Sequence, residues 1–105
     1  MTENYYKDYV LSGKVDIEKF LESDNYLVYF HTNPFWEFHL VLIPKFYVLD
    51  IYEIEDNSKK LEFFEVLSEV VRKVKDTKNG CEVMFNVGEY RHLHVHIHSG
   101  KRIRE

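Results

Sequence analysis

Four histidines alternate with apolar residues near the C-terminus, in the segment His92-Leu93-His94-Val95-His96-Ile97-His98. Successive side chains of a β-strand point to opposite faces, so a strand would place the four imidazoles on one face and the apolar residues on the other. Neighbours on one face lie about 6.6–7 Å apart. That spacing lets a central ring reach a tetrahedral phosphorus while its neighbours contact the same group. The pattern therefore predicts a strand with one core face and one face for phosphate chemistry.

His94 is the central ring of the first three histidines. Clustering makes the cationic form of each imidazole harder to reach, which lowers the pKa values and favours a neutral ring with an available lone pair. A neutral His94 is a competent nucleophile, and a bond from its other nitrogen to a backbone carbonyl would fix both its tautomer and its aim. The row therefore predicts covalent catalysis at a phosphate.

Zinc binding is the main alternative for this row, because imidazoles two residues apart on a strand are common zinc ligands. Four rings in one straight row splay along the strand, however, so a tetrahedral site would need a ligand from another segment. His39 or His31 could supply it. We therefore expect no required cofactor and leave zinc open as the less favoured option. A polar strand face that is merely rich in histidine is the third interpretation.

The composition of the whole chain predicts a single domain, residues 1–105. Of the 105 residues, 45% are hydrophobic and 16% are aromatic, which is enough for one hydrophobic core. Its 14 basic and 18 acidic residues give a net charge of −4 with no long basic stripe, so we expect no nucleic-acid partner. The one basic cluster, Lys101-Arg102-Ile103-Arg104, lies in the tail 101–105. We interpret it as a solvated tail, with a guide for anionic ligands as the alternative.

Cysteine content and the N-terminus indicate the compartment. The single Cys81 cannot form an intramolecular disulfide, and the first residues lack the basic and apolar regions of a signal peptide. No apolar run approaches the ~18 residues that span a bilayer. We therefore expect a cytoplasmic protein with no membrane partner, in which Cys81 is a core residue rather than a nucleophile.

Apolar periodicity and turn residues predict the elements that position the histidines. In chain order we expect a short helix at Asp16–Leu21, strands at Tyr26–Phe30 and Phe38–Ile43, a long helix at Ser58–Lys75 ended by Asn79-Gly80, and strands at Glu82–Val87 and His92–Ser99. The segment Val48–Ile54 is ambiguous between strand and irregular structure. The short connection Gly88-Glu89-Tyr90-Arg91 favours antiparallel pairing of the last two strands.

Several segments together resemble the histidine-triad (HIT) superfamily, whose signature is His-φ-His-φ-His-φ-φ with φ apolar. His92 to Ile97 fit this signature, with His98 in the last apolar position. The block His39-Leu40-Val41-Leu42-Ile43-Pro44-Lys45 is similar to the family's His-x-φ-φ-φ-Pro-Lys, and Asn86-Val87-Gly88 to its Asn-x-Gly. Leu11 to Lys14 and Tyr29 to Pro34 resemble its N-terminal segment and its nucleotide-binding strand and turn.

The resemblance implies an α+β fold with a mainly antiparallel five-stranded sheet, one long helix and a short N-terminal helix, and a homodimer. It also implies a hydrolase or nucleotidyl transferase that acts on a nucleoside 5′-phosphoramidate or a dinucleoside polyphosphate. The expected product is a purine nucleoside monophosphate. No cofactor is required for this chemistry.

Residue roles follow from the same resemblance. His94 matches the nucleophile that forms a covalent nucleotidyl-histidine, His92 the orienting histidine, and His96 the one linked to phosphate contact and leaving-group protonation. His39 would support His96. The residues expected to bind the nucleotide or its phosphate are His39, Asn86, His31, Thr32 and His98.

Besides His98, the chain departs from the family pattern at several other points. The connection from Asn86 to His92 is several residues shorter than in typical members, Thr32 stands where many relatives have an acidic ribose-binding residue, and Phe46-Tyr47 follows Lys45 where a histidine is common. These departures keep a second function open. The chain could be a non-catalytic nucleotide-binding or protein-interaction domain of the same family.

Overall fold

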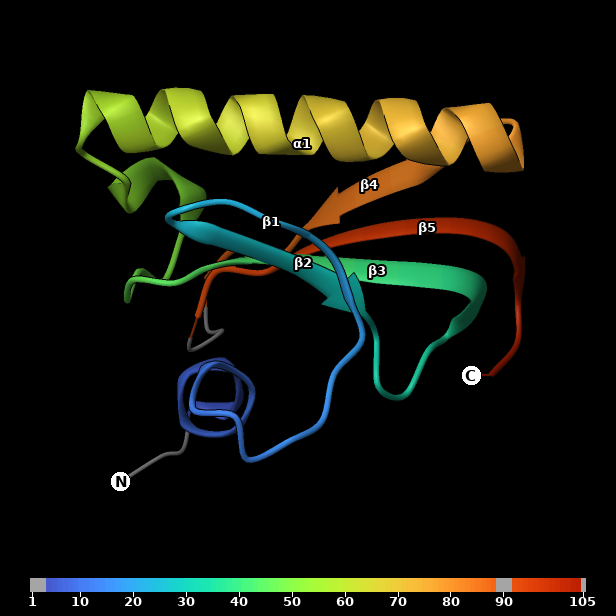
Figure 1. The fold of residues 1–105 in the computed structure, drawn as a ribbon, viewed down its shortest axis with the longest axis horizontal. Helices are drawn as coiled ribbons and strands as arrows, with labels where there is room; N and C mark the ends of the chain where they lie inside the picture. Colours follow the sequence, from blue (N-terminus) through green and yellow to red (C-terminus); the bar gives the residue numbers. More distant parts are fainter. Residues whose placement is uncertain (1–3, 89–91, 105) are drawn as a thin grey trace.

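The structure is a computed structural model that describes residues 4–88 and 92–104. Figure 1 shows an antiparallel sheet with a long helix across one face, and the strand order is β1-β2-β3-β5-β4. The strands are β1 (Lys19–Glu22), β2 (Tyr26–Phe30), β3 (Trp36–Pro44), β4 (Glu82–Phe85) and β5 (Val95–Arg102). The expected α+β fold with a five-stranded sheet is confirmed.

The long helix α1 (Asn57–Lys78) matches the predicted helix and extends it at both ends. The Asp56 side chain accepts the backbone N–H of Lys59 at 3.0 Å and so caps the first turn. Asn79 ends the helix in the left-handed conformation, with φ of 68°. The buried face of α1 packs on the sheet through Phe63, Val66, Val70 and Val74.

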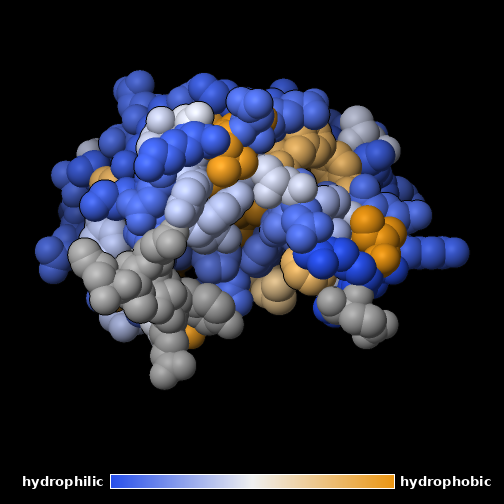
Figure 2. Space-filling model, turned by 90° about the horizontal axis from the view of Figure 1, so that it is seen from below, coloured by the Kyte–Doolittle hydropathy of each residue, from blue (hydrophilic) through white to orange (hydrophobic). Residues whose placement is uncertain are grey.

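The opposite face of the sheet is covered by the N-terminal segment. This segment forms a short π-helix, η1 (Tyr6–Leu11), and Val10 from it packs on β2 and β3 residues. Strand β3 is central and is buried on both faces from His39 onward. The sheet thus has a predominantly apolar side under α1 and a mixed side near η1. Figure 2 shows the molecule from this second side, where hydrophilic residues dominate and apolar residues form separate patches.

The helix expected at Asp16–Leu21 is wrong, because Lys19–Glu22 form the edge strand β1. A helix of six residues has little stability of its own, whereas β1 gains ladder bonds by pairing with β2, with Leu21 opposite Val28. Phe20 packs edge to face on Phe30, with ring centroids 5.7 Å apart. The short N-terminal helix exists, but it lies earlier in the chain, as η1.

The predicted histidine strand begins later than expected. Regular pairing starts at Val95 and runs to Arg102, so His92 and His94 lie in irregular backbone before β5. The reason is local hydrogen bonding, since the backbone N–H of Leu93 donates to the carbonyl of Val48 at 2.8 Å instead of joining the ladder. The predicted short connection at Gly88 to Arg91 falls partly on residues 89–91, which lie outside the described residues.

The ambiguous segment Val48–Ile54 contains a short 3-10 helix, η2 (Ile51–Glu53), opened by Asp50. Cys81 is partly buried against the main core, as expected, and burial raises the pKa of its thiol. Within the described residues, no helix is both long and apolar enough to cross a membrane.

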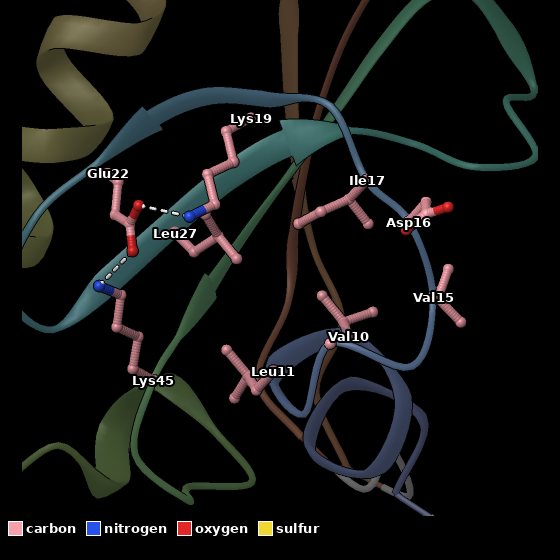
Figure 3. Close-up of a pocket in the computed structure, with 10 residues that line it drawn as sticks. Val10, Leu11, Val15, Asp16, Ile17, Lys19, Glu22, Leu27 and Lys45 are labelled. Carbon is pink, nitrogen blue, oxygen red and sulfur yellow. Dashed lines mark hydrogen bonds and ion pairs between the residues drawn. The ribbon is translucent and has the colours of Figure 1, made fainter.

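A cavity of about 500 Å³ lies between η1 and the β1–β2 edge. Figure 3 shows apolar side chains such as Leu11, Ile17 and Leu27 around it. At its border Glu22 binds two lysines, Lys19 at 2.9 Å and Lys45 at 2.6 Å. Lys45, the last residue of the His-x-φ-φ-φ-Pro-Lys block, thus ties the end of β3 to β1 and does not reach toward the histidines.

Val70 provides a direct test of the helix-on-sheet core, because it is fully buried. We expect Val70→Ala to lower the free energy of unfolding by about 2–3 kcal/mol, since two methyl groups and their packing are lost. Urea unfolding measures this change. The matched control is Val71→Ala on the neighbouring, half-buried position, for which we expect less than about 1 kcal/mol. Equal losses in the two variants would contradict the packing described here.

Candidate active site

His92 and His94 form the first part of a histidine cluster, and hydrogen bonds define where each ring carries its proton. His92 Nε2 lies 3.0 Å from the carbonyl oxygen of Pro44, which only accepts, so the proton of His92 is on Nε2. His94 Nδ1 lies 2.9 Å from the carbonyl oxygen of His92, so His94 donates from Nδ1. A neutral His94 therefore has its lone pair on Nε2, as a nucleophile requires.

His39 and His96 form the second part of the cluster. The backbone N–H of Phe35 donates to His39 Nδ1 at 3.1 Å, so a neutral His39 carries its proton on Nε2. His39 Nε2 then donates to His96 Nδ1 at 2.9 Å. His96 in turn carries its proton on Nε2. These hydrogen bonds make His96 Nε2 an N–H donor. His94 differs, because its Nε2 carries a lone pair.

The rings of His94 and His96 lie close together, with centroids 5.1 Å apart and planes at 88°. A lone pair and an N–H donor are thus presented by neighbouring rings. A phosphate placed between them would meet a nucleophile on His94 and a hydrogen-bond donor on His96. The family resemblance implied a nucleophile at His94 and a proton donor at His96. The backbone carbonyl of His92 and the N–H of Phe35 set proton positions that are compatible with these two roles.

His31 adds a third ring to the His39 and His96 pair. Its centroid lies 4.4 Å from that of His39, and the backbone N–H of Asn33 donates to His31 Nδ1 at 3.0 Å. One nitrogen from each of His31, His39 and His96 lies within 4.8 Å of the others, so these are the candidate metal ligands among the described residues. In the neutral rings of His31 and His39, however, backbone donors occupy Nδ1 and protons occupy Nε2. A metal at Nε2 would have to displace these protons and disrupt the backbone hydrogen bonds.

Burial keeps the cluster neutral. Desolvation, with a smaller contribution from the neighbouring imidazoles, lowers the pKa of His39 to about 3 and that of His96 to about 4. Desolvation also lowers the pKa of His94 and His92, while their hydrogen bonds to backbone carbonyls act in the opposite direction. At neutral pH these four rings are therefore uncharged, as expected, but burial is the main cause. Clustering, the cause that the sequence indicated, contributes for His39, His92 and His96.

A cavity of about 430 Å³ opens beside the cluster, between η1 and the end of β2. Among the described residues its lining is aromatic and polar, without a carboxylate: Tyr5, Tyr6, Tyr29, His31, Thr32 and Asn33. Across it the Tyr5 hydroxyl lies 3.4 Å from Thr32 Oγ1. The predicted residues His31 and Thr32 thus border a space of the size that a small molecule can occupy.

The two remaining predicted site residues are Asn86, which lies beside the His94 position, and His98, which lies further from His94. Asn86 follows β4 directly, one position beyond the Phe85–Val95 pair and thus beside the His94 position, and its side-chain oxygen is buried without a hydrogen-bond partner among the described residues. His98 lies further along β5. It stacks on Trp36 at 3.6 Å and is 3.7 Å from a Glu82 carboxylate oxygen, contacts that hold it away from the reactive pair.

Two N-terminal residues that contact the cluster were not among the residues predicted from the sequence. Tyr6 stacks on His94 with centroids 4.8 Å apart, and burial raises the pKa of Tyr6 to about 12. The Asn4 side chain lies 3.1 Å from His92 Nδ1. The available signal was Asn4 itself, a residue that favours the start of a helix.

The basic tail is more ordered than the expected solvated tail. The Arg104 guanidinium lies 3.9 Å from the Phe35 ring centroid and donates to the carbonyls of Pro34 and Asn33 at 3.1 and 3.0 Å. Burial lowers the pKa of His31, and the positive charge of Arg104 adds a smaller contribution in the same direction. The tail is exposed, but its arginine packs on the turn beside the cavity.

Comparison with known proteins agrees with this geometry. The family model described as HIT domain matches residues 12–103. A HIT-like protein of Helicobacter pylori strain 26695 is 30% identical over 98 residues, covering 89% of this chain and 93% of the relative. A 13.2 kDa HIT-like protein from Azospirillum brasilense is 28% identical over 102 residues, covering 90% of this chain and 84% of the relative.

Solved structures with a similar fold also include HIT-like and histidine triad proteins. A structure described as a Hit-like protein is 29% identical and has a TM-score of 0.78, with 94% of this chain and all of that chain covered. A histidine triad protein from Clostridium difficile is 25% identical with a TM-score of 0.69, over 92% and 90% of the two chains. With the domain matched over most of its length and the triad in place, this chain belongs to the HIT-domain family.

Proposed function

We propose that this chain is a nucleotide hydrolase or nucleotidyl transferase that cleaves the bond to the α-phosphate of a nucleoside 5′-phosphoramidate or dinucleoside polyphosphate. The observation that carries the proposal is the bond from His94 Nδ1 to the His92 carbonyl, which leaves the lone pair on Nε2 next to the donor on His96. A related fold from Legionella pneumophila is described as a HIT family hydrolase, which is consistent with this class of reaction.

The reaction takes place in two displacements. His94 Nε2 forms a bond to the α-phosphorus while the bond from phosphorus to the leaving group breaks, and the electron pair departs with the leaving group. The His96 N–H stabilises the negative charge on the phosphate. The bound phosphate raises the proton affinity of His96, and a proton taken up there passes to the leaving group. Water then attacks the phosphorus of the nucleotidyl-histidine and gives one proton to His96, which replaces the proton passed to the leaving group. The bond from phosphorus to His94 Nε2 breaks, and the nucleoside monophosphate and neutral His94 are released.

The nucleoside is placed in the cavity beside the cluster. Its tyrosine rings suit a flat base, and His31, Thr32 and Asn33 offer polar contacts to the sugar. The size of the cavity, about 430 Å³, suits one nucleoside. No metal takes part in this mechanism, because the proton positions set by the backbone donors on His31 and His39 suit hydrogen bonding rather than metal ligation.

We also propose that the chain forms a homodimer through α1 and β4. Strand β4 is an edge strand whose four residues are all exposed, and Phe85 on it is 40% exposed. On α1, Leu61 and Phe64 are 59% and 67% exposed. An unpaired strand edge beside exposed large apolar side chains is typical of a protein interface.

The first test is turnover. We expect the purified protein to hydrolyse an adenosine or guanosine 5′-phosphoramidate with a chelator in all buffers, and His94→Gly to lose at least about 1,000-fold in kcat because the nucleophile is gone. Product formation is followed by chromatography. Free imidazole should restore part of the activity of His94→Gly, which a merely structural role would not allow. Nucleotide binding without turnover of phosphoramidates or dinucleoside polyphosphates by the wild type would favour the binding-domain alternative.

The second test is pH dependence. His94 must be neutral to attack, and burial lowers its pKa, so the reactive form persists to lower pH than for an ordinary histidine. We expect kcat/KM to be level near pH 7 and to fall on the acid side only below the ordinary value of about 6.5. Circular dichroism over the same range separates loss of activity from unfolding. An acid limb centred at or above about 6.5 would contradict a desolvated nucleophile.

The third test concerns assembly. We expect sedimentation to give a dimer for the wild type and a monomer for Phe64→Glu, because a charge in an apolar interface is not compensated. Ile103→Glu is the matched control, since Ile103 is also exposed, at 53%, but lies near the C-terminus and outside the proposed interface. A wild-type monomer, or a Phe64→Glu dimer of unchanged affinity, would rule out this interface.

A further inference from the structure

Asn4 is a buried polar residue, 8% exposed, that bridges the N-terminal segment and the histidine cluster. Its backbone and side chain both make bonds within the first helical turn. The carbonyl of Asn4 accepts the backbone N–H of Asp8 at 2.7 Å, and Asn4 Oδ1 accepts the backbone N–H of Lys7 at 3.1 Å. The side chain therefore acts as a cap for η1, as asparagine commonly does at helix starts.

The cap also determines which way the amide faces. Because Lys7 N–H must donate, the atom that it meets is the Asn4 oxygen, so the amide nitrogen is the atom that faces His92. Asn4 Nδ2 lies 3.1 Å from His92 Nδ1. An amide nitrogen only donates, so His92 Nδ1 accepts. On the other side of the ring, His92 Nε2 donates to the carbonyl of Pro44 at 3.0 Å.

His92 is thus held between one donor and one acceptor, and the same residue supplies the carbonyl that fixes the tautomer of His94. A ring that loses one of these two partners is free to turn or to change tautomer. Because His92 is 1% exposed, water would not readily replace the missing partner. The position of the His92 ring and the aim of its carbonyl are therefore linked to a residue at the other end of the chain.

We propose that Asn4 is a positioning residue for the histidine cluster: its amide holds His92 in the neutral Nε2–H form and keeps the His92 carbonyl aimed at His94 Nδ1. The proposal deepens the proposed function, because it names a residue that prepares the nucleophile without touching the substrate. It also gives the N-terminal segment a role in the reaction. Tyr6 of the same segment packs on His94, so both rings depend on how this segment is seated.

Two substitutions separate the donor of Asn4 from its cap. Serine and aspartate both cap helix starts well, so each keeps the bond to Lys7 N–H. Asn4→Ser is too short to reach His92 and removes the donor without adding charge. Asn4→Asp replaces the donor with an acceptor, so that His92 can satisfy both its neighbours only by carrying protons on both nitrogens. The matched controls are Asn57→Ser and Asn57→Asp at the exposed start of α1.

The primary measurement is the nitrogen NMR spectrum of the histidine rings in the full chain, which reports tautomer and charge directly. We expect neutral Nε2–H His92 in the wild type and in both controls, mixed tautomers in Asn4→Ser, and a doubly protonated His92 at neutral pH in Asn4→Asp. A His92 spectrum that is unchanged in both Asn4 variants would overturn the proposal. This result does not depend on whether the protein has the proposed activity.

The second measurement is kinetic and uses the phosphoramidate assay. We expect kcat to fall about 10-fold in Asn4→Ser while KM changes less than about 3-fold, because positioning affects the chemical step more than binding. Thermal unfolding should remain within a few degrees of the wild type, since the cap is retained. A changed His92 spectrum with unchanged kcat would overturn the positioning role, whereas an inactive wild type would count against the proposed function alone.

Discussion

A neutral imidazole has one proton for two nitrogens, so a buried ring needs one acceptor and one donor around it. This constraint governs the histidine cluster. The carbonyls of Pro44 and His92 accept hydrogen bonds from His92 and His94, whereas backbone N–H groups of Asn33 and Phe35 donate to His31 and His39. Main-chain groups, which move little, therefore decide which nitrogen of each ring is a donor and which is an acceptor.

The pairing of the strands and a break in that pairing place these main-chain groups. Pairing of β3 with β5 sets Val41 opposite His96 and His39 opposite His98, which brings His39 within bonding distance of His96. The bend before β5 turns the His92 carbonyl towards His94 instead of into the sheet ladder. The core under α1 holds both strands in register, and η1 closes the other face. His94 therefore presents a lone pair because the backbone before β5 leaves the regular sheet. His96 presents an N–H donor because the register of β3 and β5 brings it next to His39.

Much of the fold and part of the histidine site could be predicted from the sequence. The long helix, the central strands and the alternation of histidines follow from apolar periodicity, and the resemblance carried by His39 to Lys45 and by Asn86 to Gly88 indicated the family. The edge strand β1 could not be separated from a helix, because Phe20 and Leu21 fit either period and only pairing with β2 decides between them. Asn4 and Tyr6 were missed because their partners lie about 88 residues away, and no local pattern signals a contact over that separation.

The central claim is that His94, with its lone pair on Nε2, forms a covalent bond to the substrate phosphorus. The most direct measurement is a mass spectrum of the protein quenched in acid-free conditions during turnover of a nucleoside phosphoramidate, followed by peptide mapping. The account predicts an added nucleoside monophosphate on the peptide that contains His94, located at that residue. Turnover with no adduct under conditions that would trap it, or an adduct on His92 or His96 instead, would contradict the account.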